Sequence, residues 1–295
     1  MSRGRMAAAD VRTIAGYALR EAVRRRALVV VIVLTVGFLL AVFAYGSHEA
    51  FDEVSRLGAA GNADIGLDDQ VLTGSTLLGL AMFVTLFLGT VLAVFVTLNA
   101  VRGDAERGLL QPLVVRPVGR TTLLLARFLA AVAVCVPYVV IVYGTSVMLT
   151  GVTGDYWPDR PVAGGVALAS AVTIVVCLAL VGTTLLSSTA NGIAIFMIFG
   201  AGLAAGLMGQ IGSALNSETL EQISSIASWI LPFEAIYQDG LHALTADIGG
   251  ATGVVVELGP FGGAQDAGPL LYPYALAYLV IASLLANRIF NRMDL

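Results

Sequence analysis

The sequence predicts an all-α, polytopic membrane protein with six transmembrane helices, an N-terminal amphipathic interfacial helix and a short external helical hairpin before the last span. Hydrophobic residues make up 58% of the 295 residues and charged residues only 12%, whereas a soluble domain carries about 25% charged residues. The mean hydropathy is +0.88. Six runs reach the roughly 20 apolar residues that a spanning helix needs, so most of the chain is expected to lie in lipid.

The six predicted spans form a single transmembrane domain, residues 1–295. They are residues 27–45, 74–99, 128–150, 163–186, 192–210 and 270–288. Only the last contains a charged residue, Arg288 at its end. The two cysteines, Cys135 and Cys177, fall inside apolar runs, where a thiol usually behaves as a small hydrophobic group.

The arginines predict the orientation of these spans. They cluster before the first span (Arg12, Arg20, Arg24, Arg25 and Arg26), between the second and third (Arg102, Arg107, Arg116, Arg120 and Arg127) and after the last (Arg292). The opposite loops are acidic: residues 211–269 hold seven acidic residues and no arginine. Because loops rich in basic residues stay in the cytoplasm, both termini are predicted to be cytoplasmic.

Residues 10–26, before the first span, read as a basic helix with two faces. Val11, Ile14 and Leu19 share one face, and Arg20 and Arg24 share the other. Such helices lie in the membrane interface and favour anionic lipid. The alternative is an ordinary solvated helix leading into the first span.

The fifth span carries Gly202 and Gly206, a GxxxG spacing that lets two helices approach closely. Glycine is common in membrane helices generally. The spacing therefore indicates helix–helix contact without saying whether the contact lies within one chain or between two.

The external segment 211–269 contains two short amphipathic helices separated by Pro232. Neither is long enough to span, so they suit a re-entrant or interfacial hairpin. Their apolar faces include Leu220, Ile223, Ile230, Phe233, Ile236 and Leu241. We expect the hairpin to pack over spans five and six at the outer leaflet and to gate release, with Glu234 and Asp239 in solvent. A docking surface for an external protein is the alternative.

The cytoplasmic link, residues 100–121, is the most informative stretch for function. Three charged residues, Asp104, Glu106 and Arg107, precede Leu109, Leu110 and Leu113, which suggests a short helix with one face against protein. Pro117 ends this helix and Gly119-Arg120 turns the chain into the third span. The physics alone leaves two readings open: a docking site for a soluble partner, or a topology anchor without a partner.

The same link carries a family resemblance. An acidic residue followed by Arg-Gly, two leucines and then Pro-x-x-Arg, between spans two and three, resembles the permease subunits of the type-2 ABC exporter family, especially NosY-like and multidrug-export permeases. The matching residues are Glu106, Arg107, Gly108, Leu109, Leu110, Pro117 and Arg120. The family usually has threonine or serine in place of Leu109 and lysine near Arg127. The amphipathic start, the order of spans and the external helices extend the resemblance over nearly the whole chain.

The resemblance implies a half-size permease that dimerises and binds two copies of a separate ABC ATPase in the plasma membrane. That partner would bind the ATP and magnesium, so no cofactor and no metal is expected in this chain, and nucleic acid is not among its partners. The implied ATPase-docking residues are Asp104, Glu106, Arg107, Gly108, Leu109, Leu110, Pro117 and Arg120. The implied transport pathway runs along spans two and five and would include Thr85, Thr90, Thr97, Asn191 and Gln210, although such groups are more often satisfied inside a bundle.

Other classes fit the residues less well. The chain has no lysine, which a P-loop requires, so it cannot hydrolyse ATP by that route. A catalytic role is not expected, since the only histidines, His48 and His242, lie outside the spans and no nucleophile motif occurs. An ion-coupled carrier would need ionisable groups at mid-membrane depth, and the spans have none. A membrane scaffold that recruits a soluble protein without transporting anything remains a further alternative.

Overall fold

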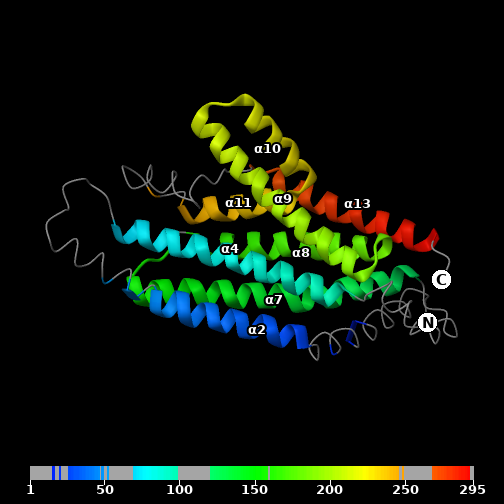
Figure 1. Cartoon of the computed structure of the whole chain (residues 1–295), viewed down its shortest axis with the longest axis horizontal. Helices are drawn as coiled ribbons and strands as arrows, with labels where there is room; N and C mark the ends of the chain where they lie inside the picture. Colours follow the sequence, from blue (N-terminus) through cyan, green and yellow to red (C-terminus); the bar gives the residue numbers. More distant parts are fainter. Residues whose placement is uncertain are drawn as a thin grey trace.

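A computed structural model of the chain describes residues 15–16, 20, 26–46, 48–49, 52, 69–98, 120–158, 160–245, 248 and 268–292. Over these residues the chain forms helices and connecting turns, without a strand. In chain order the elements are α2 (Arg26–Phe38), the π-helical segment η1 (Leu39–Tyr45), α4 (Asp69–Thr97), α7 (Arg120–Gly154), α8 (Pro161–Leu185), α9 (Ser188–Leu215), α10 (Glu218–Ile230), α11 (Pro232–Thr245) and α13 (Leu271–Arg292). Figure 1 shows their arrangement.

Five of these helices, α4, α7, α8, α9 and α13, are long and apolar enough to cross a membrane. The first predicted span corresponds to α2, a 13-residue α-helix, followed directly by the seven π-helical residues of η1. The prediction of an all-α polytopic membrane protein is therefore confirmed.

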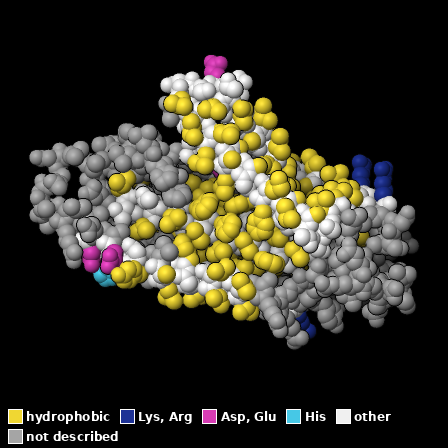
Figure 2. Space-filling view, in the orientation of Figure 1, with side chains coloured by type: hydrophobic (Ala, Val, Ile, Leu, Met, Phe, Trp, Pro, Cys, Tyr) yellow, Lys and Arg dark blue, Asp and Glu magenta, His cyan; other side chains and the backbone are white. Residues whose placement is uncertain are grey.

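Helix α8 is the centre of the bundle. It contacts α4, α7, α9, α11 and α13, and its buried residues fall on all sides of the helix. A helix that is apolar all round is expected to be enclosed. The outer helices instead present large apolar side chains to the surroundings, among them Ile141, Met197 and Ile281. Figure 2 shows this continuous hydrophobic surface, which suits contact with lipid.

Helix α2 is attached to the bundle through a polar contact with α7. The Thr35 hydroxyl donates to the Val31 carbonyl at 2.8 Å, so its single hydrogen is used within α2. The 2.5 Å contact between the Thr35 and Tyr138 hydroxyls then has Tyr138 as its donor. This hydrogen bond links α2 to α7, and α2 also packs against α4.

The hairpin of α9 and α10 leans out of the bundle (Figure 1). Asn216, with a φ of 50°, ends α9 in the left-handed conformation, and the Ser217 N–H donates to the Gly212 carbonyl at 2.8 Å, as at many helix C-termini. Helix α10 then packs back on α9 but has no buried residue of its own. Its apolar side chains, such as Ile226 at 62% exposure, lie on the surface of the chain.

Helix α11 enters the bundle instead of lying over spans five and six. Its main partner is α8, the fourth span, with smaller contacts to α9, α13 and α4. Gly240 permits this approach, because a side chain there would come within 2.6 Å of the Ala167 Cβ. Phe233, Ile236 and Leu241 are buried as a result. The expected position of the hairpin was therefore wrong for its second helix, since the small residues on α8 could not be recognised as its partner surface.

Candidate functional site

Most of the predicted docking segment lies outside the described residues. This applies to Asp104, Glu106, Arg107, Gly108, Leu109, Leu110 and Pro117, and Arg120 is the first residue of α7. The predicted interfacial helix, residues 10–26, is described only at residues 15, 16, 20 and 26. The docking function therefore stays a prediction.

Three of the predicted pathway residues lie on α4 and are buried. The Thr85 and Thr97 hydroxyls donate to carbonyls one turn back, those of Ala81 at 2.7 Å and Ala93 at 2.8 Å. The buried Thr90 hydroxyl has no hydrogen-bond partner within the described part of the chain. These positions belong to the interior of one bundle, and their part in transport stays a prediction.

Asn191, near the start of α9, is also buried. Its amide nitrogen donates to the Ala179 carbonyl on α8 at 3.0 Å. Its side-chain oxygen lies against Gly182, where any Cβ would overlap with it. Asn191 therefore joins α8 to α9, and glycine at position 182 makes room for it.

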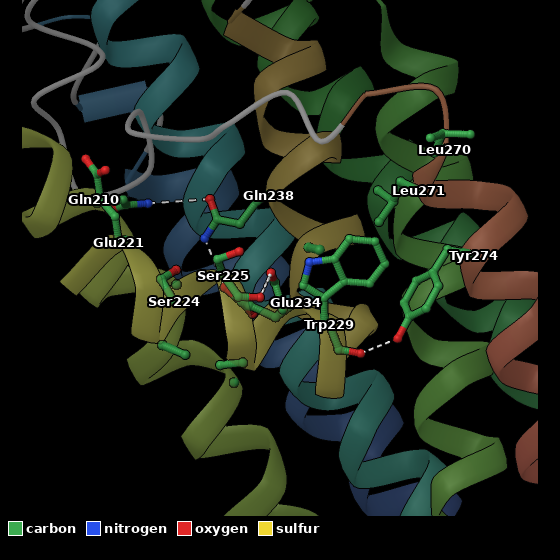
Figure 3. A pocket seen from close by; sticks show the side chains of 17 residues that line it. Gln210, Glu221, Ser224, Ser225, Trp229, Glu234, Gln238, Leu270, Leu271 and Tyr274 are labelled. Atoms are coloured by element: carbon green, nitrogen blue, oxygen red, sulfur yellow. Dashed lines mark hydrogen bonds between the residues drawn. The ribbon is translucent and has the colours of Figure 1, made fainter. Parts of the chain in front are cut away.

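The fifth predicted pathway residue, Gln210, lines a cavity of about 590 Å³ enclosed by α9, α10, α11 and the start of α13. Figure 3 shows Gln210 reaching from α9 toward Gln238 on α11, to whose side-chain oxygen it donates at 3.4 Å. Gln238 in turn donates to Glu234 Oε1 at 2.9 Å. A chain of hydrogen bonds thus crosses the cavity wall from α9 to the one buried carboxyl group of the described residues.

Glu234 is only 3% exposed, and its Oε2 atom has no hydrogen-bond partner within the described part of the chain. Burial raises the pKa of Glu234 to about 7, although the hydrogen bond from Gln238 acts to lower it. A buried carboxylate oxygen without a partner is costly. This atom therefore marks the wall of the cavity as a place suited to a polar or charged group.

The expectation that Glu234 points to solvent was wrong. At about 100° per residue, Glu234 lies within about 20° of Leu241 on the helical wheel of α11, next to the face that packs in the bundle. The charge of Glu234 suggested that its side chain would be in solvent, but its position on the buried face of α11 places it inside the protein. Asp239, on another face of α11, accepts a hydrogen bond from the exposed Tyr272 hydroxyl at 3.0 Å.

Glycines of α9 form the floor of the cavity. A Cβ at Gly206 would overlap with Glu234 Oε1, and one at Gly209 would come within 2.5 Å of Ser224 Oγ. A Cβ at Gly202 would come equally close to the Phe233 ring. The GxxxG spacing therefore produces helix contact within the chain, where α9 receives α10 and α11.

An aromatic pair closes the side of the cavity that faces α13. Trp229 of α10 and Tyr274 of α13 meet edge to face with ring centroids 4.7 Å apart, and the Tyr274 hydroxyl donates to the Trp229 carbonyl. Glu221 and Ser224 of α10 also line the cavity. The site thus combines two carboxyl groups, several amides and hydroxyls, and apolar walls.

Sequence reasoning missed most of these residues, namely Glu221, Ser224, Trp229, Gln238 and Tyr274. One signal was available. Gly202, Gly206 and Gly209 recur at helical spacing on α9, which indicates a groove, and Glu234 and Gln238 stand four residues apart on a short amphipathic helix that follows. Nothing in the sequence, however, brings these two features together.

The bundle of long apolar helices defines a polytopic membrane protein, and its cavity is lined by both polar and apolar side chains. Residues 12–295 match the family model described as ABC-2 family transporter protein. The chain therefore belongs to the ABC-2 family and is a multi-pass permease of the ABC transporter type. Members of this family are generally non-catalytic membrane subunits that work with an ABC ATPase. A search of curated proteins finds no match to the chain.

Proposed function

We propose that this chain is the membrane subunit of an exporter that is driven by ATP hydrolysis in a separate ABC ATPase. The match of residues 12–295 to the ABC-2 family carries this proposal. The absence of lysine is consistent with it, because the chain then has no P-loop and any ATP hydrolysis by that route must occur in a partner. ATP and magnesium would be bound by that ATPase.

Two copies of the permease would form a homodimer in the plasma membrane and bind two ATPase subunits. The link from Asp104 to Arg120 would dock the ATPase on the cytoplasmic side. The arginines in and around this link support that orientation. In the structure, α7 begins and α13 ends close together, since Thr121 donates to the Asn287 side chain at 2.8 Å, and Arg288 and Arg292 follow nearby.

The experiment that tests this proposal is reconstitution with an ABC ATPase that co-purifies with this chain. The permease purified alone should show no ATP turnover, and the complex should hydrolyse ATP and release substrate from the side opposite the ATPase. Leu109→Asp should abolish substrate-stimulated hydrolysis, while Leu276→Asn, a change on an outer face of α13, should not. Normal coupling by Leu109→Asp would show that the ATPase docks elsewhere.

One observation favours a second candidate, a carrier coupled to protons. The buried Glu234 supplies an ionisable group inside the bundle, which the predicted spans alone do not, and such groups mark proton and ion pathways. Uptake or release driven by a pH gradient in vesicles that contain the permease without any ATPase would favour the carrier. Strict dependence on the ATPase would exclude it.

A further inference from the structure

Three features of the cavity restrict what it can bind. Of the described residues that line it, two are charged, Glu221 and Glu234, and both are acidic. Glu234 is a lining residue, and its Oε2 atom is buried without a hydrogen-bond partner among the described residues. The remaining lining is mixed, with apolar side chains such as Trp229, Tyr274 and Leu271 beside serines and glutamines.

An anion would meet two carboxyl groups and no positive charge, so anions are disfavoured. A neutral apolar molecule would leave Glu234 Oε2 unsatisfied, which is costly. A hard divalent metal ion prefers six or more oxygen ligands, and no group of three or more histidine, cysteine or acidic side chains occurs among the described residues. These three classes are therefore poor matches.

An organic cation fits all three features. Its ammonium group would pair with the Glu234 carboxyl group, a lining residue of the cavity, in a charge-assisted hydrogen bond, and the aromatic pair would attract it through the ring faces and contact its apolar part. A volume of about 590 Å³ falls within the range of about 300–1,000 Å³ that is typical of small-molecule sites.

We propose that the cavity between α9, α10, α11 and α13 binds a small amphipathic organic cation, with Glu234 as the counter-ion of its ammonium group and Trp229 and Tyr274 as the walls around its apolar part. Gln238 holds Glu234 in place, and Gln210 holds Gln238. The proposal concerns binding to the permease itself. It does not depend on the exporter function.

The binding should depend on pH. The other titratable groups around Glu234 are Glu221 on α10, Tyr237 on α11 and Tyr274 on α13. The described side chains of α9 and α4 include no titratable group, and the one on α8, Cys177, lies against Leu279 and Ser283 of α13. Because a cation binds the ionised carboxylate, affinity should rise as the pH rises through the pKa of Glu234, which burial places near 7.

The test uses the purified permease in lipid nanodiscs without an ATPase, and two probes of the same shape. These are 4-phenylbutylammonium, which is a cation, and 4-phenylbutan-1-ol, which is neutral. Trp157→Phe leaves Trp229 as the only tryptophan of the two in the chain, so quenching of its fluorescence reports on the cavity. Nanodiscs without protein correct for partition into lipid.

We expect saturable binding of the cation at pH 8. Its affinity should be at least about tenfold higher than that of the alcohol, because a hydrogen bond to a charged group contributes about that factor. Glu234→Gln should weaken cation binding about tenfold or more, leave alcohol binding unchanged and remove the rise between pH 6 and pH 8. Glu218→Gln, on an exposed acid at the start of α10, serves as the control and should bind like the wild type.

Equal affinity of the wild type for the two probes would overturn the proposal, and this comparison needs no variant in the cavity. Full cation affinity in Glu234→Gln would overturn it as well, as would the lack of saturable binding. Since no ATP is involved, failure of the exporter function would leave these outcomes unaffected.

Discussion

The α-carbon of Gly206 on α9 faces the Glu234 carboxyl group of α11, and a methyl group at position 206 would overlap with Glu234 Oε1. Glycine at this position therefore allows a buried acid to lie against a helix of the bundle. The same contact sets the floor of the cavity. It connects the glycine pattern of the fifth span to the chemistry of the site.

Gly206→Ala should destabilise the protein, because the added methyl must displace Glu234. Overpacking of this kind costs about 1–3 kcal/mol, which a lowered thermal midpoint in detergent would reveal. Gly200→Ala on the same helix is the matched control, since nothing lies within 4 Å of its added Cβ. That change should leave stability equal or raise it by roughly 0.5–1 kcal/mol.

Combining Gly206→Ala with Glu234→Ala should recover part of the lost stability, because the smaller side chain gives way to the methyl group. Contacting residues are expected to show such non-additive effects. Equal thermal midpoints for Gly206→Ala and Gly200→Ala would mean that the close approach of Gly206 and Glu234 does not affect stability.

Glu234→Gln should change how stability depends on pH. The pKa of Glu234 is raised from 4.5 to about 7 in the folded protein, so the folded state binds more protons than the unfolded state between these values. Stability of the wild type should therefore fall as the pH rises from about 4.5 to about 7, by on the order of 3 kcal/mol, and stay level above.

The variant lacks this titration, so its thermal midpoint should exceed that of the wild type at pH 8, and the difference should shrink toward pH 5. Glu218→Gln, at an exposed position, should follow the wild type throughout. Parallel pH profiles for Glu234→Gln and the wild type would show that folding does not change the pKa of Glu234.

Changes in the cytoplasmic link should uncouple the ATPase to different degrees. In the proposed docking site, charge reversal at Glu106 or Arg107 would remove one ion pair; an exposed pair is worth about 0–1 kcal/mol, so we expect only weaker substrate-stimulated hydrolysis. Leu109→Asp or Leu110→Asp removes an apolar anchor, which can cost 2 kcal/mol or more, and should do worse. Membrane insertion, measured by yield in the membrane fraction, should be unchanged, and an inverted ranking would argue against apolar docking.

The proposed orientation can be checked by labelling single cysteines introduced at Arg116 and Asp64. An impermeant thiol reagent should label them from opposite sides of the membrane, with Arg116 reached from the cytoplasm. The two natural cysteines, Cys135 and Cys177, are buried and should give the unmodified protein as an unlabelled control. Labelling of both positions from one side would contradict the six-span arrangement.

Helix α10 should enter the lipid. Ile223, Ile226 and Ile230 are exposed on the chain, and burying a large apolar side chain stabilises by about 1.5–3 kcal/mol. In nanodiscs without other proteins, amide exchange should be slow across α10 and slow across the core-packed α11. Fast exchange in α10 that slows only when an external protein is added would instead identify a protein docking surface.

Much of the fold could be predicted because lipid imposes a simple rule. A helix in lipid must be apolar along about 20 residues, and the runs that became α4, α7, α8, α9 and α13 meet this rule. Pro232 predicted the break between α10 and α11 for an equally local reason, the missing N–H and fixed φ of proline. The family could be inferred from the order of short motifs, beginning with Glu106-Arg107-Gly108.

The arrangement of these helices depended on the tertiary structure. Lipid and a protein core are similarly apolar, so the sequence of α8 does not say that this helix is central while α13 lies outside. The burial of Glu234 likewise depends on how the helices pack. Gln238 reaches its carboxyl group from the next turn of the same helix, but Gly206 of α9 and Tyr274 of α13 line the same cavity from distant parts of the sequence, and only the packing of α11 in the bundle brings the acid to them.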